Sequence, residues 1–410
     1  MRRVVITGLG PVSPIGIGKE NYWSALREKI NGVGLLTEIE LYDCPISFGA
    51  EIKNFDPTAW MDNKDARRSD RAIQFAVAAS ALAVKDARLD TNSLDPYRFG
   101  VYIGSGQGGI ATSFDQFKIM LEKGSKRVSP FFIPMMISNM STAYVAICHN
   151  AKGPNMCVVT ACATSIHSLG EAYHTIVRND ADVILSGGTE AGLKAICLAG
   201  FASMKALSTR SGEPEKASRP FDKDRDGFVM GEGAGVLVLE ELEHARKRGA
   251  HIYAELVGYG TSCDAEHITA PAADANGAAY ATKKAIDMAG WKTDDVDYIN
   301  AHGTSTELND KTESLMINNI FGEHARTIPV NSTKSIIGHC LGAAGALETI
   351  ATIQAIEEGY VHPTLNYENP DPECNVNVIA GDGLQKQVKH ALINSFGFGG
   401  HNGVLGLSKM

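Results

Sequence analysis

Short β-rich runs alternate with longer runs of helical periodicity along the whole chain. Helical spacing of the apolar positions predicts helices over Asp70–Ala87 and Ala275–Ala289, among others. Alternation of this kind predicts an α/β protein in which helices pack on sheets. The runs that predict strands are Val4–Gly8, Gly100–Ile103, Met156–Thr160, Val183–Ser186, Gly235–Glu240, Ala254–Gly258, Tyr298–Ala301, Val330–Ser332, Ala391–Asn394 and Gly403–Leu407.

The same order of strand and turn motifs occurs twice along the chain. VVITGLG resembles AELVGYG, RFGVYIGSG resembles DVDYINAHGT, and GAGVLVLEE resembles HNGVLGLSK, in the same order in both halves. Such self-similarity indicates a duplicated fold. We predict an N-terminal half over residues 1–250 and a C-terminal half over residues 251–410. The first half is longer, so residues 105–150 and 193–232 are predicted insertions.

Composition excludes several classes of protein. The 410 residues are 44% hydrophobic and 21% charged, an ordinary globular mix, and the formal net charge of −9 argues against a general nucleic-acid-binding protein. No run reaches the roughly 18 consecutive apolar residues that a membrane span needs, and the N-terminal run is too short for a signal peptide. The eight cysteines are scattered, which predicts reduced thiols and a cytoplasmic location.

Two motifs imitate ligand sites. The turn at residues 8–13 begins like a dinucleotide fingerprint, but Pro11 interrupts it and Ser13 replaces the third glycine. Residues 222–227 imitate a calcium loop, yet the twelfth position is Gly233 and a strand follows. We therefore expect neither a nucleotide site nor a metal site, and interpret residues 222–227 as a charged turn.

Four reactive side chains are predicted at strand ends or helix starts. Cys162 lies between a β-branched strand and a helix, where unpaired amides and the helix dipole favour a thiolate. A buried structural cysteine is the alternative. His302 follows a strand, and both Lys334 and His339 precede a small-residue helix. Because such ends gather at the carboxyl edge of a sheet, we expect these four side chains to share one site.

The motifs around these residues resemble those of the β-ketoacyl-[acyl carrier protein] synthases of the KAS II type. They are TACATS around Cys162, NAHGTST around His302, STKS-x-x-GH around Lys334 and His339, and NSFGFGGHN near the C-terminus. The resemblance covers essentially the whole chain. It implies the thiolase fold, a duplicated α-β-α-β-α sandwich with two five-stranded mixed sheets, in a homodimer. It also implies a monovalent cation site, which the sequence does not place.

The resemblance further implies a decarboxylating Claisen condensation on acyl carrier protein. The only prosthetic group is then the phosphopantetheine arm of the carrier protein, and the enzyme needs no cofactor. Cys162 takes the acyl group, and the backbone N–H groups of Cys162 and Phe398 form the oxyanion hole. His302 and His339 hold the enolate that malonyl decarboxylation leaves, with electrostatic support from Lys334. A thiolase would need a second cysteine, which the GFGG loop lacks.

Other implied residues shape the substrate path. Phe398 gates the acyl pocket, and the segment at 131–136 lines the acyl tunnel, partly across the dimer interface, unless it is plain core. The alternative role of Thr269, Thr304 and Thr306 is to stabilise turns through their hydroxyls. The alternative interpretation of the basic clusters is a solvated surface without a partner. The substrate-binding candidates are Gln107, Phe201, Thr269, Thr304, Thr306, Gly397 and Gly399, and the docking candidates for the acidic carrier protein are Lys64, Arg67, Arg68, Lys126 and Arg127.

Two positions depart from the family pattern. Leu308 replaces a proline, and Gln107 stands where an aliphatic residue is usual. A buried Gln needs polar partners, which an apolar chain lacks. We hypothesise that Gln107 shortens the accepted chain or admits functionalised acyl groups. A ketosynthase of a polyketide or polyene pathway is therefore the alternative to fatty acid elongation. A non-condensing partner, such as a chain-length factor or a malonyl decarboxylase, is disfavoured because Cys162 is present.

Overall fold

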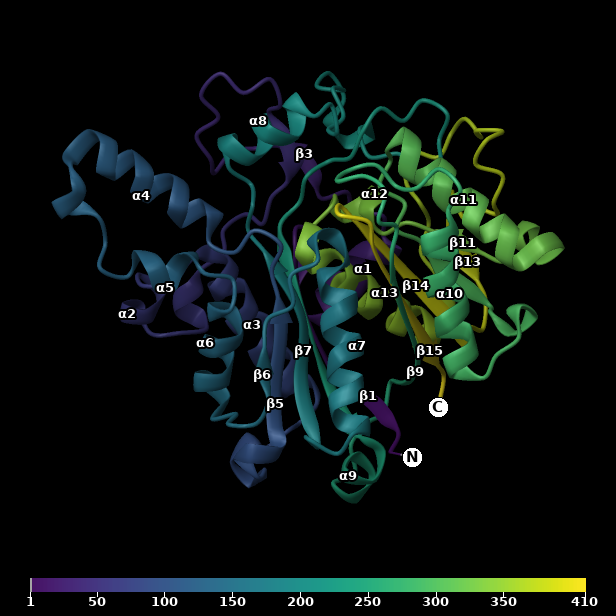
Figure 1. Ribbon diagram of the computed structural model, residues 1–410, viewed down its shortest axis with the longest axis horizontal. Helices are drawn as coiled ribbons and strands as arrows, with labels where there is room; N and C mark the ends of the chain where they lie inside the picture. The colour runs from purple at the N-terminus through teal and green to yellow at the C-terminus, as the bar shows by residue number, and fades with distance from the viewer. Residues whose placement is uncertain (1) are drawn as a thin grey trace.

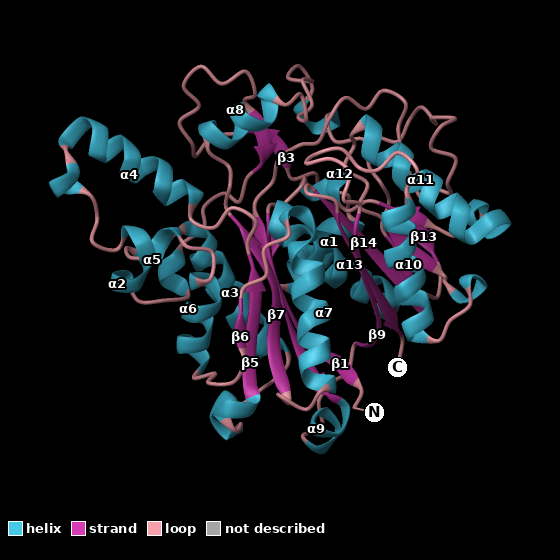
Figure 2. Cartoon of the chain, viewed as in Figure 1, coloured by secondary structure: helices cyan, strands magenta, loops and turns pink. Residues whose placement is uncertain are grey.

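The computed structural model describes residues 2–410 as two blocks of strands flanked by helices (Figures 1 and 2). The first block contains β1 (Val4–Ser13), β5 (Phe99–Gly104), β6 (Asn155–Met156), β7 (Val183–Glu190) and β8 (Gly233–Glu241). The second contains β9 (Ala254–Cys263), β10 (Tyr298–Asn300), β11 (Val330–Asn331), β14 (His390–Gly397) and β15 (His401–Ser408). The short strands are β2 (Gly16–Ile17), β3 (Val33–Leu35), β4 (Phe48–Ala50), β12 (Tyr360–Val361) and β13 (Leu384–Gln385).

Helices occupy most of the chain between these strands. They are α1 (Lys19–Arg27), α2 (Asn63–Ala66), α3 (Arg71–Asp86), α4 (Ile110–Lys123), α5 (Phe132–Met136), α6 (Met140–His149), α7 (Thr164–Val177), α8 (Ala195–Ser203), α9 (Leu242–Lys247), α10 (Asn276–Ala289), α11 (Glu307–Phe321), α12 (Lys334–Ile337) and α13 (Ala344–Glu358). No helix within residues 2–410 has the length and apolar character that would let it cross a bilayer.

The two blocks share one strand order. The first block runs β1-β8-β7-β5-β6 and the second runs β9-β15-β14-β10-β11. Equivalent neighbours also have the same direction, since the first two pairs of each block are antiparallel and the last two are parallel. A shared order with shared directions is the mark of a duplicated fold, as the sequence repeats predicted.

The two predicted five-stranded sheets are joined along their first strands. β1 pairs with β9 at three positions only, from Val4 with Leu256 to Ile6 with Ala254, which makes one sheet of eleven strands with β2 included. The predicted strand Met156–Thr160 is also shorter than expected. β6 pairs with β5 only at Asn155–Met156, because the chain then leaves the sheet toward the turn that carries Cys162.

Helices form the layers around and between the blocks. α7 and α13 pack against each other and contact strands of both blocks, so they form the central layer (Figure 1). α3 and α6 cover the outer face of the first block, and α10 with α11 cover that of the second. The α-β-α-β-α layering that the resemblance implied is therefore present.

Glycines of the repeated strand motif let each outer helix touch its strand. A Cβ on Gly10 would lie 1.9 Å from the carbonyl oxygen of Ala79 in α3. A Cβ on Gly260, the equivalent residue of β9, would lie 1.8 Å from the carbonyl oxygen of Ala281 in α10. The glycine pattern that imitates a dinucleotide fingerprint therefore serves helix-to-strand packing.

The halves differ mainly in the lengths of two links. The link from β5 to β6 spans residues 105–154 and holds α4, α5 and α6, whereas the link from β10 to β11 spans residues 301–329. The link from β7 to β8 spans residues 191–232, whereas β14 and β15 are joined by residues 398–400. The first half thus carries extra chain in the two regions predicted from the sequence.

Replacing either buried glycine of the repeat by alanine should destabilise the protein. Gly10→Ala and Gly260→Ala each push a methyl group into a helix carbonyl, and overpacking of this kind costs about 1–3 kcal/mol. The urea midpoint of unfolding should therefore fall in both variants. Gly200→Ala in α8 is the matched control, because a Cβ there meets nothing within 4 Å. Equal midpoints for all three variants would contradict the packing argument.

Candidate active site

A cavity of about 460 Å³ opens beside Cys162 and is lined from both halves of the chain. Ten of the residues predicted from the sequence line it. They are Gln107, Cys162, Phe201, Thr269, His302, Thr304, Thr306, His339, Gly397 and Phe398. Lys334 and Gly399 are not among its lining residues. The sequence prediction of one shared site is therefore matched by the geometry, with Lys334 placed behind the wall.

Cys162 lies in a tight turn that leads into the central helix α7. The 3₁₀ turn spans Ala161–Ala163, and Ala161 has a φ of +49°. Cys162 is 8% exposed, so the sulfur is reached only through the cavity. Burial raises the pKa of the Cys162 thiol to about 12, while the charge of Lys334 and a hydrogen bond from the backbone of Phe398 act in the opposite direction. Burial thus opposes the effect of the helix start that the sequence suggested.

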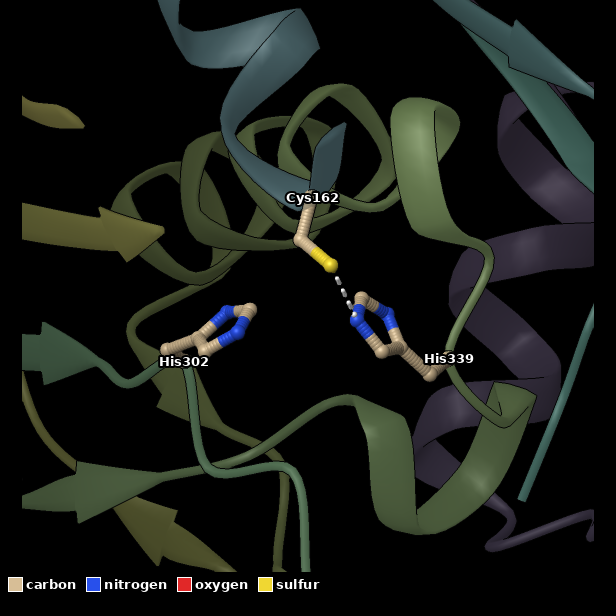
Figure 3. A group of neighbouring side chains, drawn as sticks. All are labelled: Cys162, His302 and His339. Carbon is tan, nitrogen blue, oxygen red and sulfur yellow. Dashed lines mark hydrogen bonds between the residues drawn. The ribbon is translucent and has the colours of Figure 1, made fainter. Parts of the chain in front are cut away.

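His339 hydrogen-bonds the sulfur of Cys162 through a defined nitrogen. Its Nε2 lies 3.0 Å from Cys162 Sγ (Figure 3). The backbone N–H of Leu341 donates to His339 Nδ1 at 3.3 Å, which leaves the ring proton of a neutral imidazole on Nε2. Nε2–H therefore points into the cavity as a hydrogen-bond donor.

His302 faces the same space from the other side (Figure 3). Its ring centroid lies 5.4 Å from that of His339, with the planes at 82°. The buried carboxylate of Glu313 accepts the backbone N–H of His302 at 2.9 Å and that of Gly303 at 2.8 Å, which fixes the turn after β10. Two imidazoles and one sulfur thus converge on a single small volume.

Lys334 and Glu348 form a buried ion pair behind the histidines. Burial lowers the pKa of both His302 and His339 well below the usual value, and the positive charge of Lys334 lowers it further. Both rings are therefore neutral at physiological pH and act as N–H donors. The charge of Lys334 acts strongly on both rings because the buried interior has a low dielectric constant.

The glycine loop lies directly opposite the amide of Cys162. A Cβ on Gly397 would lie 3.1 Å from Cys162 N and 2.8 Å from Thr160 O. Any side chain there would fill the space in front of the Cys162 amide. Gly399 has a φ of +85° and donates its N–H to Ile268 O at 2.8 Å, so it shapes the loop turn.

The remaining predicted residues separate into a pocket wall and an entrance. The rings of Phe201 and Phe398 lie 6.4 Å apart, and the hydroxyls of Thr304 and Thr306 lie 2.9 Å apart. Lys205, which the sequence reading missed, is exposed at the cavity mouth. Its signal in the sequence is weak, because a single lysine after an apolar helix is common on surfaces.

One sequence expectation differs from the pocket that this chain forms. No residue of 131–136 is among the lining residues of the cavity within the described chain. The segment instead packs under the turn after β5, where Gly109 N donates to Met136 O at 2.9 Å. It therefore supports the pocket wall from behind within one copy of the chain.

The five basic docking candidates lie outside the cavity, in two groups. Lys64 and Arg67 are exposed in and after α2, and Lys126 and Arg127 are exposed in the turn after α4. Arg68 is half-buried, and its guanidinium lies 4.2 Å from the centroid of the Phe131 ring. Arg68 thus contacts Phe131, which follows the turn that carries Lys126 and Arg127.

The cysteine and the two histidines also form a donor set that metals use. Their ligand atoms all lie within 4.8 Å of one another, and zinc accepts this combination. The charge of Lys334, which lowers the pKa of both histidines, also disfavours a metal cation beside them. We therefore keep the prediction that the site works without a metal at these three residues.

Comparison with known proteins agrees with this geometry. Residues 1–245 match the profile of the β-ketoacyl synthase N-terminal domain, and residues 253–368 match that of the C-terminal domain. The chain belongs to the β-ketoacyl synthase family. It is 51% identical over 408 residues to a 3-oxoacyl-[acyl-carrier-protein] synthase 2 of Synechocystis sp., covering 100% of this chain and 98% of the relative.

Solved ketosynthases share the fold of this β-ketoacyl synthase. The ishigamide ketosynthase/chain length factor matches with a TM-score of 0.94 and 36% identity, covering 100% of this chain and 99% of the other. A type II polyketide synthase acyl-carrier protein in complex with its ketosynthase, bound to the hexaketide, provides a match with a TM-score of 0.88 and 35% identity, over 100% and 99% of the two chains. The thiolase fold is therefore the fold of this chain.

The raised pKa of Cys162 predicts an unusual pH dependence of alkylation. With a pKa near 12, the thiolate fraction should increase about tenfold per pH unit through the whole range from pH 7 to 10. Iodoacetamide labelling of Cys162, followed by peptide mass spectrometry, should rise without a plateau. A cysteine in a short unstructured peptide, with a pKa of about 8.5, levels off in the same range and is the reference. A plateau at Cys162 below pH 8 would show that the helix start outweighs burial.

Proposed function

We propose that this β-ketoacyl synthase condenses malonyl-[acyl carrier protein] with an acyl group held on Cys162. The product is a 3-oxoacyl-[acyl carrier protein], and the pathway is fatty acid elongation. The observation that carries the proposal is one buried sulfur facing two neutral imidazoles in one cavity. The two imidazoles supply hydrogen-bond donors but no strong base. They therefore fit a reaction in which the substrate becomes a carbanion by losing carbon dioxide, not by losing a proton to the enzyme.

The first step transfers the acyl group to the enzyme. Cys162 Sγ attacks the carbonyl carbon of the acyl thioester, the pantetheine sulfur leaves, and the proton of the Cys162 thiol ends on that sulfur. The amides of Cys162 and Phe398 hold the oxyanion, and Gly397 leaves their approach open. Removing one donor of such a hole typically costs about 100- to 1,000-fold in rate.

The second step uses the histidines. When the malonyl thioester loses carbon dioxide, negative charge develops on its thioester oxygen. His339 Nε2–H and the N–H of His302 donate to that oxygen. The enolate carbon then attacks the carbonyl of acyl-Cys162, and the thiolate of Cys162 leaves. Lys334 touches neither substrate and acts by its charge on the two rings.

Three buried oxygens near this centre fit the monovalent cation that the resemblance implies. Asn300 Oδ1, Asn394 Oδ1 and Glu348 Oε2 have no donor among residues 2–410. Strands β10 and β14, which carry the two asparagines, are neighbours, with Asn300 paired to Ile393. We propose that these residues hold the ion, with Glu348 as the charged ligand. The proposed chemistry needs no other cofactor.

Carrier protein and a second copy of the chain are the proposed partners. The cavity mouth at Lys205 lies between the catalytic centre and solvent, and the basic residues of α2 and of the turn after α4 suit an acidic carrier protein.

β6 ends the strand order, and Met156 and Val159 are exposed there. An exposed apolar edge strand favours pairing with a second copy. We also propose that the chain consists of two halves, residues 1–250 and 251–410. We further propose that the protein is located in the cytoplasm.

A ketosynthase of a polyketide or polyene pathway is the alternative, because the same three groups would serve it. Two observations favour it. The structural relatives include polyketide ketosynthases, and Gln107 places a polar group in the pocket. The relatives named 3-oxoacyl-[acyl-carrier-protein] synthase 2 are more similar in sequence, at 51% against 35%. Elongation of fatty acids is therefore our first choice.

A ladder of saturated acyl-carrier proteins with malonyl-carrier protein tests the function. The wild type should extend medium and long chains by two carbons, as read by intact mass. Cys162→Ala should abolish acyl transfer, whereas His302→Ala and His339→Ala should still load the acyl group and lose condensation by at least about 100-fold. Malonyl loss without extension would favour the specialised pathway. Absence of loading from every donor would remove Cys162 as the nucleophile.

Reversing the basic groups tests carrier-protein docking separately from chemistry. Lys64→Glu combined with Arg67→Glu should raise KM for acyl-carrier protein by about tenfold at low salt, with kcat nearly unchanged. Loading from a short acyl-pantetheine thioester should not change, because that substrate lacks the acidic protein. Exposed Lys283→Glu combined with Lys284→Glu in α10 is the matched control. Equal KM values in both double variants would exclude this docking face.

A further inference from the structure

Four alternate residues mark a path from the catalytic centre to solvent. His302 is 2% exposed, Thr304 is 6% exposed, Thr306 is half-buried and Leu308 is 56% exposed. All four line the same cavity. Because exposure increases steadily along this strip, a ligand arm that enters the cavity passes Leu308 first and reaches His302 last.

The backbone of this strip is held by two buried charged side chains. The carboxylate of Asp310 accepts the backbone N–H of Thr304 at 3.0 Å. The guanidinium of Arg225 donates to Thr306 O and to Glu307 O, each at 3.2 Å. Arg225 and Asp310 also form an ion pair with each other at 3.8 Å. The residues of the strip therefore keep their order along the cavity wall.

Leu308 is an apolar side chain that the packing of the fold does not explain. It lies in the first turn of α11 and belongs to none of the apolar clusters that residues 2–410 form. Met204, which follows α8 and is 47% exposed, is likewise outside these clusters. Single exposed apolar residues are common, but these two come from different halves of the chain and line one cavity. Together they make part of the cavity mouth apolar.

The pantetheine arm carries its polar and apolar groups in an order that matches this strip. Counted outward from the thioester sulfur, the arm has two amides, then a hydroxyl-bearing carbon, then a carbon with two methyl groups, and finally the phosphate. When the thioester lies beside Cys162, the two amides lie along Thr304 and Thr306. The dimethyl carbon follows them outward, and the next residue of the strip is Leu308.

We propose that Leu308 is a substrate-binding residue that packs against the dimethyl carbon of the pantetheine arm, with Met204 completing the apolar contact. This inference rests on the proposed condensing function. It gives a binding role to Leu308, one of the two departures from the family pattern. Burial of two methyl groups against a fixed wall strengthens binding of the arm and helps to place its thioester beside Cys162. Acyl and malonyl substrates share the arm, so both use this contact.

The test removes the two methyl groups from the arm. One acyl group is offered as its thioester with pantetheine, with a pantetheine analogue that has hydrogens in place of both methyl groups, with N-acetylcysteamine, which ends before the dimethyl carbon, and with acyl carrier protein. Intact mass gives the second-order rate constant of acyl transfer to Cys162. The wild type should load from pantetheine about tenfold faster than from the analogue, because the analogue buries two fewer methyl groups.

Variants link this preference to the apolar mouth. Leu308→Ala should reduce the preference to about threefold or less and leave loading from N-acetylcysteamine unchanged. Alanine is a strong helix former, so α11 should keep its first turn. Leu315→Ala is the matched control, because Leu315 is 40% exposed on the same helix and does not line the cavity. Its preference should stay near tenfold. Met204→Ala should also reduce the preference, and it serves if the Leu308 variant does not fold.

Each contrary result has a separate meaning. Equal loading from pantetheine and its analogue would overturn the inference and leave the condensing function intact. The same holds for a preference that survives both Leu308→Ala and Met204→Ala, and for an equal loss with N-acetylcysteamine, which would make the role of Leu308 structural. A loss confined to acyl carrier protein would show that Leu308 contacts the carrier itself and not its arm. Failure of every donor to load Cys162 would overturn the proposed function.

Discussion

The buried carboxylate of Glu190 joins the two halves of the chain at the candidate active site. Its four hydrogen bonds come from Ser105, Gly106, Gln107 and, in the second half, Gly342. Four donors require an ionised carboxylate, yet burial raises the pKa of Glu190 to about 7. Its negative charge also raises the pKa of Cys162. The interaction that fixes the pocket wall therefore opposes thiolate formation, and the rest of the site has to compensate for it.

That compensation comes from charge rather than from proton transfer. Lys334 is buried in an ion pair with Glu348 and lowers the pKa of Cys162, His302 and His339. One positive charge thus favours a thiolate and keeps the two imidazoles neutral. Thiolate, oxyanion and enolate are all negative, so the buried positive charge of Lys334 suits every stage of the proposed reaction. A site that worked by general base catalysis would need a histidine with a pKa near neutrality.

The sequence was sufficient to predict the elements and the convergence of the candidate side chains, but not their buried partners. Periodicity predicted the strands, and convergence of strand ends predicted that Cys162, His302 and His339 meet. The contact between β1 and β9 was missed, because pairing across a repeat has no local signal. Glu190 and Glu348 were also missed, although each is a lone carboxylate in a run with almost no other charge, at residues 183–193 and 344–356. Such a run around one acidic residue is a usable signal of a buried, hydrogen-bonded carboxylate.

The repeat also explains why the proposed nucleophile, Cys162, has no counterpart in the second half. The turns before α7 and α13 are equivalent, with φ of +49° at Ala161 and +46° at Leu341. The residue that follows is Cys162 in the first half and Gly342 in the second. A Cβ on Gly342 would lie 2.6 Å from Gly106 N and 2.8 Å from Glu190 Oε2. A side chain there would therefore break the contact that joins the halves, which leaves the first half to supply the sulfur and the second to supply the donors.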